Sequence, residues 1–210
     1  GTTSWALTLA WLLARNGHDL RLLCRTAAEA DEIAATRRAK RAPSLELPPS
    51  IVPTAAPAQA LDGIAMLLAG VPSQTVRDNV RPLRRALAPG TLVLHITKGL
   101  ERGTTKRVSE MLREELPQLG AGDVCALSGP NPAPEIQRGL PAATVIAGAD
   151  AARVAEAQRL LHSPAFRVYA SDDLAGVELA GSLKNVVAIA AGIADGLGFG
   201  DNAKAGIITR

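Results

Sequence analysis

Short apolar stretches alternate with helical segments along most of this chain, and that alternation is the strongest constraint on its fold. Runs with the length and composition of buried strands lie at 19–25, 64–73, 91–99, 123–130, 143–148 and 166–171, with a weaker edge strand at 50–54. Segments with helical spacing lie at 4–15, 27–40, 104–116 and 150–162, and a further helix is predicted from the turn after Ser73 to Leu87. Strands joined through helices form parallel βαβ units. We therefore predict an α/β fold with a doubly wound, mostly parallel sheet.

Polar or turn residues follow several of these strands, where a ligand would bind. In open α/β sheets, ligands lie outside the carboxyl ends of the strands. The residues at those ends are Arg25, Val71-Pro72-Ser73, Thr97-Lys98-Gly99 and Ser128-Gly129-Pro130. The sequence therefore predicts a binding site built from these loops.

After Ser171 the pattern becomes helical up to Gly196, so a second domain is predicted to start there. At 3.6 residues per turn, one apolar face of this helix is formed by Leu179, Leu183, Val186, Ala190 and Ile193. This pattern indicates a buried amphipathic helix, which Asp172 or Asp173 can cap. Its internal glycines each cost about 1 kcal/mol relative to alanine, so we expect some neighbour to need a close approach.

Lys184 lies on a neighbouring face of that helix, among small residues such as Gly181 and Ala188. A lysine half-buried among alanines has its neutral amine favoured, which makes it a usable proton donor and acceptor. The alternative is a lysine at the edge of the helix whose amine extends into solvent. The helix alone does not decide between them.

Charge and cysteine usage argue against several classes of protein. The formal net charge is +3 and only 2% of the residues are aromatic, so the chain lacks the stacking platforms or the basic stripe of a nucleic-acid-binding surface. Two cysteines, Cys24 and Cys125, lie in apolar runs and form no metal-binding motif. No apolar run approaches the roughly 18 residues of a membrane span. We expect a cytoplasmic protein with no metal, no nucleic-acid partner and no membrane insertion.

An altered dinucleotide-binding turn opens the chain. The fingerprint GxGxxG combines a tight turn, a close approach to the pyrophosphate and close packing of the helix. In GTTSWA, Gly1 keeps the first glycine, whereas Thr3 and Ala6 replace the others. Alanine is a known variant at the third place, but a side chain at Thr3 is expected to hinder the pyrophosphate. Alone, this motif is a weak signal.

Taken together, the motifs GTTSWALTLAWLLARNGH, VPS, TKG, SGPNPA, GVELAGSLKNVVAIAAGIADGLGFGDN and GIITR resemble the bacterial NAD(P)-dependent glycerol-3-phosphate dehydrogenase family over essentially the whole chain. The resemblance implies a Rossmann-type dinucleotide-binding domain at 1–170, followed at 171–210 by the start of an all-helical substrate domain. It also implies interconversion of dihydroxyacetone phosphate and sn-glycerol 3-phosphate for phospholipid synthesis, with NADPH or NADH as cofactor. A small-molecule substrate and a second copy of the chain are the implied partners.

The same resemblance assigns roles to individual residues. Cofactor contacts are implied for Ser4, Trp5, Arg25, Lys98 and Ala133; substrate contacts are implied for Lys98, Gly129, Asn131, Lys184 and Asn185. Lys184 corresponds to the catalytic proton acceptor. Arg25 stands where an acid would select the free ribose hydroxyl of NAD, and an arginine there can pair with the 2′-phosphate of NADPH. The sequence leaves the choice between NADH and NADPH open.

The loop at 129–134 departs from the family pattern. Where the family has Ser or Thr followed by Phe, and then a basic residue, this chain has Asn131, Pro132 and Pro134. Because proline removes a backbone donor, we expect an altered substrate loop.

The family's first strand would lie before Gly1, and the rest of its helical domain beyond Arg210. A sheet without its middle strand has two unpaired edges. We therefore expect the sequence to be a fragment that is poorly active alone, an expectation that an authentic start codon at Gly1 would contradict. Two alternatives stay open: a related dehydrogenase of 3-hydroxyacid or 6-phosphogluconate type, and a non-catalytic nucleotide-binding paralogue.

Overall fold

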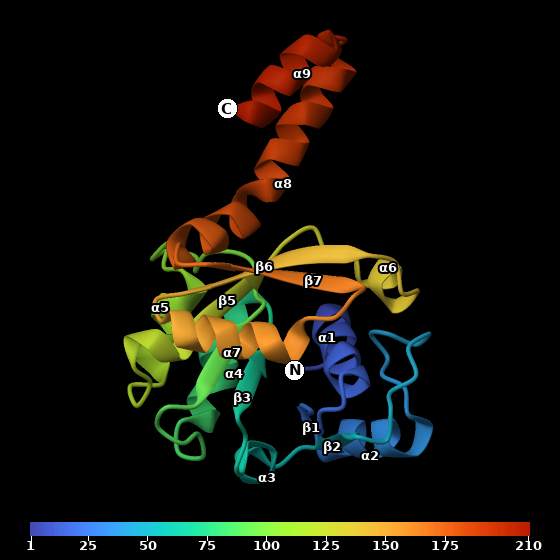
Figure 1. Cartoon of the computed structure of the whole chain (residues 1–210), viewed down its shortest axis with the longest axis vertical. Helices are drawn as coiled ribbons and strands as arrows, with labels where there is room; N and C mark the ends of the chain where they lie inside the picture. The colour runs from blue at the N-terminus through green and yellow to red at the C-terminus, as the bar shows by residue number, and fades with distance from the viewer.

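The structure is a computed structural model that describes residues 1–210, and it shows an α/β body from which a pair of helices projects (Figure 1). The strands are β1 (Leu20–Leu23), β2 (Ile51–Thr54), β3 (Met66–Ala69), β4 (Leu92–His95), β5 (Val124–Ser128), β6 (Ala142–Gly148) and β7 (Phe166–Ser171). The α-helices are α1 (Ser4–Arg15), α2 (Ala27–Thr36), α3 (Pro57–Leu61), α4 (Val76–Val80), α5 (Val108–Glu115), α6 (Ala133–Gln137), α7 (Ala151–Leu161), α8 (Leu174–Gly196) and α9 (Gly200–Thr209). Short 3-10 helices are η1 (Ser73–Thr75), η2 (Arg81–Leu83) and η3 (Ala121–Asp123).

The strands form two separate sheets. One contains β1 and β2, and the other has the order β3-β4-β5-β6-β7. Neighbouring strands are parallel except for β5 and β6, which run antiparallel. A cavity of about 870 Å³ is lined by residues of both β1 and β3. Each of these strands is paired on one side only, so the two unpaired edges expected from the sequence are present.

Helices cover both faces of the larger sheet, and alternation along β4 shows how the core is divided. Leu92 and Leu94 belong to a core cluster with residues of α1 and α7, whereas Val93 packs with residues of α4 and α5. Because successive side chains of a strand point to opposite faces, β4 contributes to both layers. The mostly parallel, Rossmann-type α/β fold predicted from the sequence is confirmed. Cys24 and Cys125 are free and buried, as expected.

The single helix predicted between β3 and β4 is wrong. The chain instead forms η1, the short helix α4 and η2, and it then runs through turns into β4. Pro82 lies near the start of η2. A proline has no N–H for the helical ladder and its ring clashes with the preceding turn, so α4 cannot continue through it.

The bounds of α8 agree with the sequence, but its predicted burial is wrong. Asp173 caps the helix by accepting a hydrogen bond of 2.7 Å from the N–H of Gly176, and the helix ends at Gly196. Its apolar face is exposed: Leu183 by 51%, Val186 by 60% and Ile193 by 58%. Figure 1 shows the reason, since α8 leaves the sheet after its first turns and only α9 packs along its outer part.

α8 also bears on the membrane expectation, which rested on the absence of a long apolar run. By length and composition alone, α8 could cross a membrane. Core helices of soluble proteins meet the same criterion, so this is weak evidence for a span.

Candidate active site

Lys98 lies just after the carboxyl end of β4 and is half-buried. Its Nζ donates a hydrogen bond of 2.9 Å to the carbonyl oxygen of Gly129, which follows β5. Burial, and secondarily the positive charge of Lys184, lower the pKa of Lys98 below its ordinary value. Of the residues predicted from the sequence, the structure therefore brings Lys98 and Gly129 into contact at the edge where β4 and β5 end, and Lys184 acts on Lys98 through its charge.

The start of α8 packs closely against this edge. A Cβ on Gly181 would lie 2.5 Å from Ser128 Oγ and 3.7 Å from Lys98 Cγ. Beside it, Ser182 Oγ accepts a hydrogen bond of 3.0 Å from the N–H of Gly99. The expectation that a helical glycine permits a close approach is confirmed at Gly181, whereas a Cβ at Gly192 would meet open space.

Lys184 does not have the predicted surroundings. Its side chain is exposed, and its Nζ donates a hydrogen bond of 2.7 Å to Oδ1 of the neighbouring Asn185. The prediction of a lysine half-buried among alanines is wrong, because α8 has already left the sheet at this turn. The conformation agrees with the alternative of an exposed lysine at the helix edge. Its electrostatic effect on Lys98 is what connects it to the site.

The loop after β5 is braced against β6 by Asn131. Its Nδ2 donates to the carbonyl of Ala143 at 3.0 Å, and its Oδ1 accepts from Thr144 Oγ1 at 3.1 Å. A Cβ on Gly129 would lie 2.9 Å from Asn131 Oδ1, so this loop requires glycine there. The amide oxygen of Asn131 is therefore already engaged within the loop.

Ala133 begins α6, with Pro132 at the cap position and Pro134 in the first turn. The backbone donors that these prolines lack would have no helical partner at those positions, so the short helix tolerates both.

The altered turn at the chain start packs without its two missing glycines. Thr3 Oγ1 donates to the carbonyl of Gly70 at 3.2 Å and accepts from the N–H of Ala6 at 3.3 Å, so its side chain caps α1. A Cβ on Gly70 would lie 2.9 Å from Ala6 Cβ. The close helix–strand contact that the fingerprint obtains from its third glycine is thus obtained here from Gly70. The twelve-residue α1 has its N-terminus at the carboxyl edge, where a helix dipole favours a phosphate. The helix N-terminus and the close contact at Gly70 fit a dinucleotide, and the hindrance expected from the Thr3 side chain stays a prediction.

The two cofactor contacts implied at the start of α1 differ in their surroundings. Ser4 is the first residue of the helix and its carbonyl accepts from Thr8 Oγ1 at 2.9 Å. Trp5 is half-buried and packs against Phe166, with ring centroids 6.4 Å apart. Trp5 therefore contributes to the core next to β7, at the base of the turn.

Arg25 is exposed after β1, and its side chain forms no ion pair. Its backbone N–H donates to Glu29 at 2.8 Å, and Thr2 Oγ1 donates to the same carboxylate at 2.8 Å. Partial burial raises the pKa of Glu29, but these hydrogen bonds outweigh it and the pKa lies below its ordinary value. The guanidinium of Arg25 is therefore available to an anionic ligand, although a carboxylate lies close by.

A buried polar cluster next to the site was missed by the sequence reasoning. Glu178 of α8 accepts from Ser109 N at 2.8 Å, Ser109 Oγ at 2.7 Å and Arg107 Nη1 at 3.2 Å. His95 Nε2, at the end of β4, lies 3.1 Å from Glu178 Oε1. Burial raises the pKa of Glu178, but His95 and Ser109 outweigh it and the pKa falls below its ordinary value. The available signal was one histidine in an apolar strand and one acid in an apolar stretch of helix.

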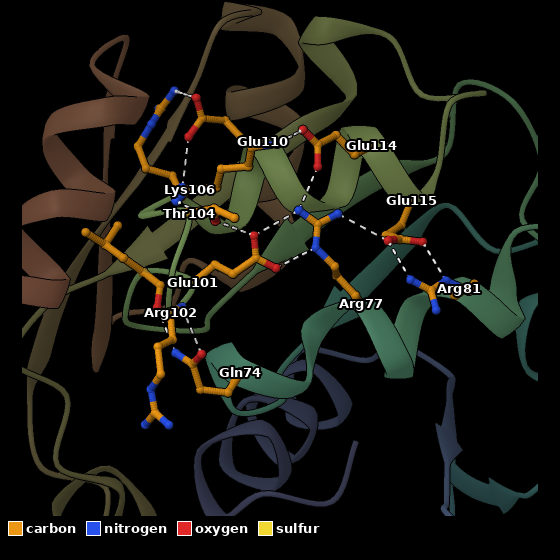
Figure 2. A network of polar contacts seen from close by, with 12 residues as sticks. Gln74, Arg77, Arg81, Glu101, Arg102, Thr104, Lys106, Glu110, Glu114 and Glu115 are labelled. Carbon is orange, nitrogen blue, oxygen red and sulfur yellow. Dashed lines mark hydrogen bonds and ion pairs between the residues drawn. The ribbon is translucent and has the colours of Figure 1, made fainter.

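The loop that follows Lys98 is held by a second network, shown in Figure 2. Arg77 of α4 bonds Glu101 of the loop at 2.5 Å, and Glu114 and Glu115 of α5 at 2.6 and 3.1 Å. Hydrogen bonds from Arg77 and then Thr104 lower the pKa of Glu101 to about 2. Gln74 adds a hydrogen bond of 2.8 Å to the carbonyl of Leu100. The network fixes this loop between α4 and α5.

The fold and these residues define a dinucleotide-binding α/β domain joined to a helical region, the architecture of two-domain dehydrogenases. A sequence model of the N-terminus of NAD-dependent glycerol-3-phosphate dehydrogenase matches residues 1–154, and one of its C-terminus matches residues 173–210. The chain therefore belongs to the NAD-dependent glycerol-3-phosphate dehydrogenase family.

Individual relatives agree with this membership. The chain is 42% identical to a glycerol-3-phosphate dehydrogenase [NAD(P)+] of Desulfitobacterium hafniense, covering 100% of this chain and 59% of that protein. It is 44% identical to one of Chlorobium luteolum, again over its whole length and 63% of the relative. The crystal structure of glycerol-3-phosphate dehydrogenase from Coxiella burnetii matches with a TM-score of 0.86 and 34% identity, over 100% of this chain and 63% of that one. The chain thus spans about three-fifths of the length of these relatives.

Proposed function

We propose that this chain contributes to an NAD(P)-dependent glycerol-3-phosphate dehydrogenase that interconverts dihydroxyacetone phosphate and sn-glycerol 3-phosphate, supplying glycerophospholipid synthesis. Residues 1–170 serve as the dinucleotide-binding domain and residues 171–210 as the start of the helical substrate domain. The observation that carries this proposal is the half-buried Lys98 against Gly129, with Lys184 close enough to lower its pKa.

In this proposal the chain's residues bind, orient and transfer a proton. The nicotinamide cofactor supplies or accepts the hydride when bound. Lys98, a cation at a strand end, binds the phosphate or the carbonyl oxygen of the substrate. Lys184 gives its proton to the carbonyl oxygen in reduction and takes the hydroxyl proton in the reverse direction. Asn185, which accepts a hydrogen bond from Lys184, orients that amine.

The cofactor site proposed here consists of the N-terminus of α1 with Ser4 and Trp5, Arg25 after β1, Lys98 after β4 and Ala133 at the start of α6. The exposed, unpaired guanidinium of Arg25 supports NADPH as the preferred cofactor. Gly129 and Asn131 complete the substrate loop, with Asn131 contributing through the loop conformation that it braces.

We also propose that the protein acts in the cytoplasm, and that α8 is a protein-packed helix and no membrane span. The free buried cysteines support a reducing compartment. The family match over 173–210, which includes all of α8, supports the second point. The exposed apolar face of α8 and α9 leaves room for a second copy of the chain as protein partner.

The test is oxidation of NADPH and of NADH by dihydroxyacetone phosphate, using the product of the complete reading frame. Turnover that falls by about 10²–10⁴ in Lys184→Ala, with cofactor affinity retained, supports the proposal. Cofactor binding without turnover by the wild-type protein would instead identify a non-catalytic paralogue. Turnover only with 3-hydroxyacids or 6-phosphogluconate would identify a related dehydrogenase.

A further inference from the structure

Glu178 is the most deeply buried charged residue of α8, and the mechanism above does not use it. Its side chain is 3% exposed and that of His95 is 2% exposed. An ionised carboxylate in such a place is costly unless several donors compensate it. Three hydrogen bonds compensate it here: Ser109 N donates to Oε1, and Ser109 Oγ and Arg107 donate to Oε2. The buried ring nitrogen Nε2 of His95 lies 3.1 Å from Oε1 and has no other polar partner.

The partners of this carboxylate come from two elements other than α8. His95 ends β4, the strand that leads to Lys98. Arg107 and Ser109 belong to the N-terminus of α5, where the helix dipole favours a negative charge. The carboxylate therefore joins α8 to the strand of Lys98 and to α5 at one point.

The same carboxylate lies at the base of the turn that leads to Lys184. The carbonyl of Glu178 accepts from Ser182 Oγ at 2.8 Å, and Ser182 Oγ accepts in turn from Gly99 N at 3.0 Å, next to Lys98. Beyond this turn α8 has no further support from the sheet, and Lys184 is exposed. The position of its amine relative to Lys98 thus depends on how the first turns of α8 are fixed.

We propose that Glu178 and His95 form a positioning clamp, which sets the distance between the amines of Lys184 and Lys98 and so holds the proton donor over the substrate site. The inference rests on the proposed function for its catalytic consequence, but its geometric consequence stands apart from it. Glu178 and His95 act through the two lysines and touch no substrate.

The test compares variants that break or keep the clamp. Glu178→Gln removes the charge, His95→Leu removes the polar ring, and His95→Gln keeps a polar N–H group close to the position of Nε2. Glu46→Gln makes the same chemical change at an exposed surface carboxylate and serves as the matched control.

Two readouts are measured on each variant of the complete protein. The first compares the change in kcat with the change in the Kd of NADPH. The second is the yield of Lys98–Lys184 cross-links with a short bifunctional succinimidyl ester, quantified by mass spectrometry. We expect Glu178→Gln and His95→Leu to lower kcat by roughly ten- to a hundred-fold, because small misplacements of a catalytic group have effects of that size. Their cross-link yield should fall while the Kd of NADPH is unchanged. His95→Gln and Glu46→Gln should keep both wild-type values.

Unchanged cross-linking and kcat in Glu178→Gln and His95→Leu would overturn the clamp. So would a loss of cofactor affinity parallel to the loss of kcat, because that pattern describes a merely structural role. If Glu178→Gln does not fold, Ser109→Ala, which removes a single hydroxyl donor, replaces it with the same expected direction. A wild-type protein that fails to reduce dihydroxyacetone phosphate refutes the proposed function only, since the cross-linking comparison still decides the clamp.

Discussion

The contact between Gly181 and Ser128 gives a quantitative prediction for how α8 is held on the sheet. Replacing Gly181 by alanine should stabilise the helix by about 1 kcal/mol from intrinsic propensity alone. The new Cβ, however, would lie 2.5 Å from Ser128 Oγ, which is too close for any real contact. Its distances to Ser128 Cβ and Lys98 Cγ, 3.5 and 3.7 Å, are ordinary. The hydroxyl of Ser128 is therefore the only obstacle.

Relieving that contact requires Ser128 to leave its rotamer or α8 to shift, which costs about 0.5–1.5 kcal/mol. We therefore expect Gly181→Ala to be close to neutral in the wild-type background. In a Ser128→Ala background it should stabilise by about 1 kcal/mol, equivalent to a rise in Tm of roughly 2–4 °C for a chain of this size. The double-mutant cycle should give a coupling of about 1 kcal/mol.

The assay is urea unfolding followed by circular dichroism, with Gly192→Ala as the control on the same helix. A Cβ at Gly192 meets nothing within 4 Å, so that change should stabilise by about 1 kcal/mol in both backgrounds. Equal effects of Gly181→Ala with and without the Ser128 hydroxyl would refute the reasoning, because they would show that the two residues are not in contact.

Three other predictions concern charged groups. Arg25→Ala should weaken NADPH binding and leave NADH binding unchanged in fluorescence titrations; an equal loss for both cofactors would contradict the role of its guanidinium. The pKa of Glu101 is lowered from 4.5 to about 2. The difference in folding stability between the wild type and Glu101→Gln should therefore be fully present above pH 4.5 and should disappear as the pH falls toward 2. Acid unfolding of both proteins measures this difference. Lys184→Ala should raise the pKa of Lys98 but not to its ordinary value, because burial, the larger cause of the lowering, remains. The pH dependence of Lys98 acetylation measures this pKa. An unchanged pKa would show that the charge of Lys184 does not act on Lys98.

The sequence predicted the elements of the α/β body well because each depends on local pattern. Apolar strands, the cap at Asp173 and the stop at Gly196 are encoded within a few neighbouring residues. The end of α4 before Pro82 was not predicted, because the segment from Ser73 to Leu87 was interpreted as one helix in spite of the proline within it. The burial of α8 was mispredicted for a different reason: periodicity shows that a face is apolar, but it does not show which element covers it.

The candidate site was predictable only in part, for a related reason. Lys98 and Gly129 come directly after predicted strands, and parallel strands bring their carboxyl ends together, so topology alone predicted their proximity. The partners of Glu178 lie far away in the sequence on β4 and α5, and no local pattern relates them. A lone acid in an apolar helix indicates that compensating donors exist somewhere, without saying where.

The packing contact of Gly181 and the polar contacts of Glu178 together explain how the first turns of α8 can position Lys184, although the body of the protein does not bury that lysine. Gly181 lets the helix backbone approach β5, which fixes its distance from the sheet. Glu178 accepts hydrogen bonds in fixed directions from α5 and lies against His95 of β4, and these contacts fix the rotation of the helix about its own axis. A close packing contact without the charged one would leave the helix free to turn, and the amine of Lys184 would turn with it. An exposed lysine is therefore compatible with a defined position only while both contacts are intact, and losing the Glu178 contact should disturb Lys184 more than it disturbs the fold.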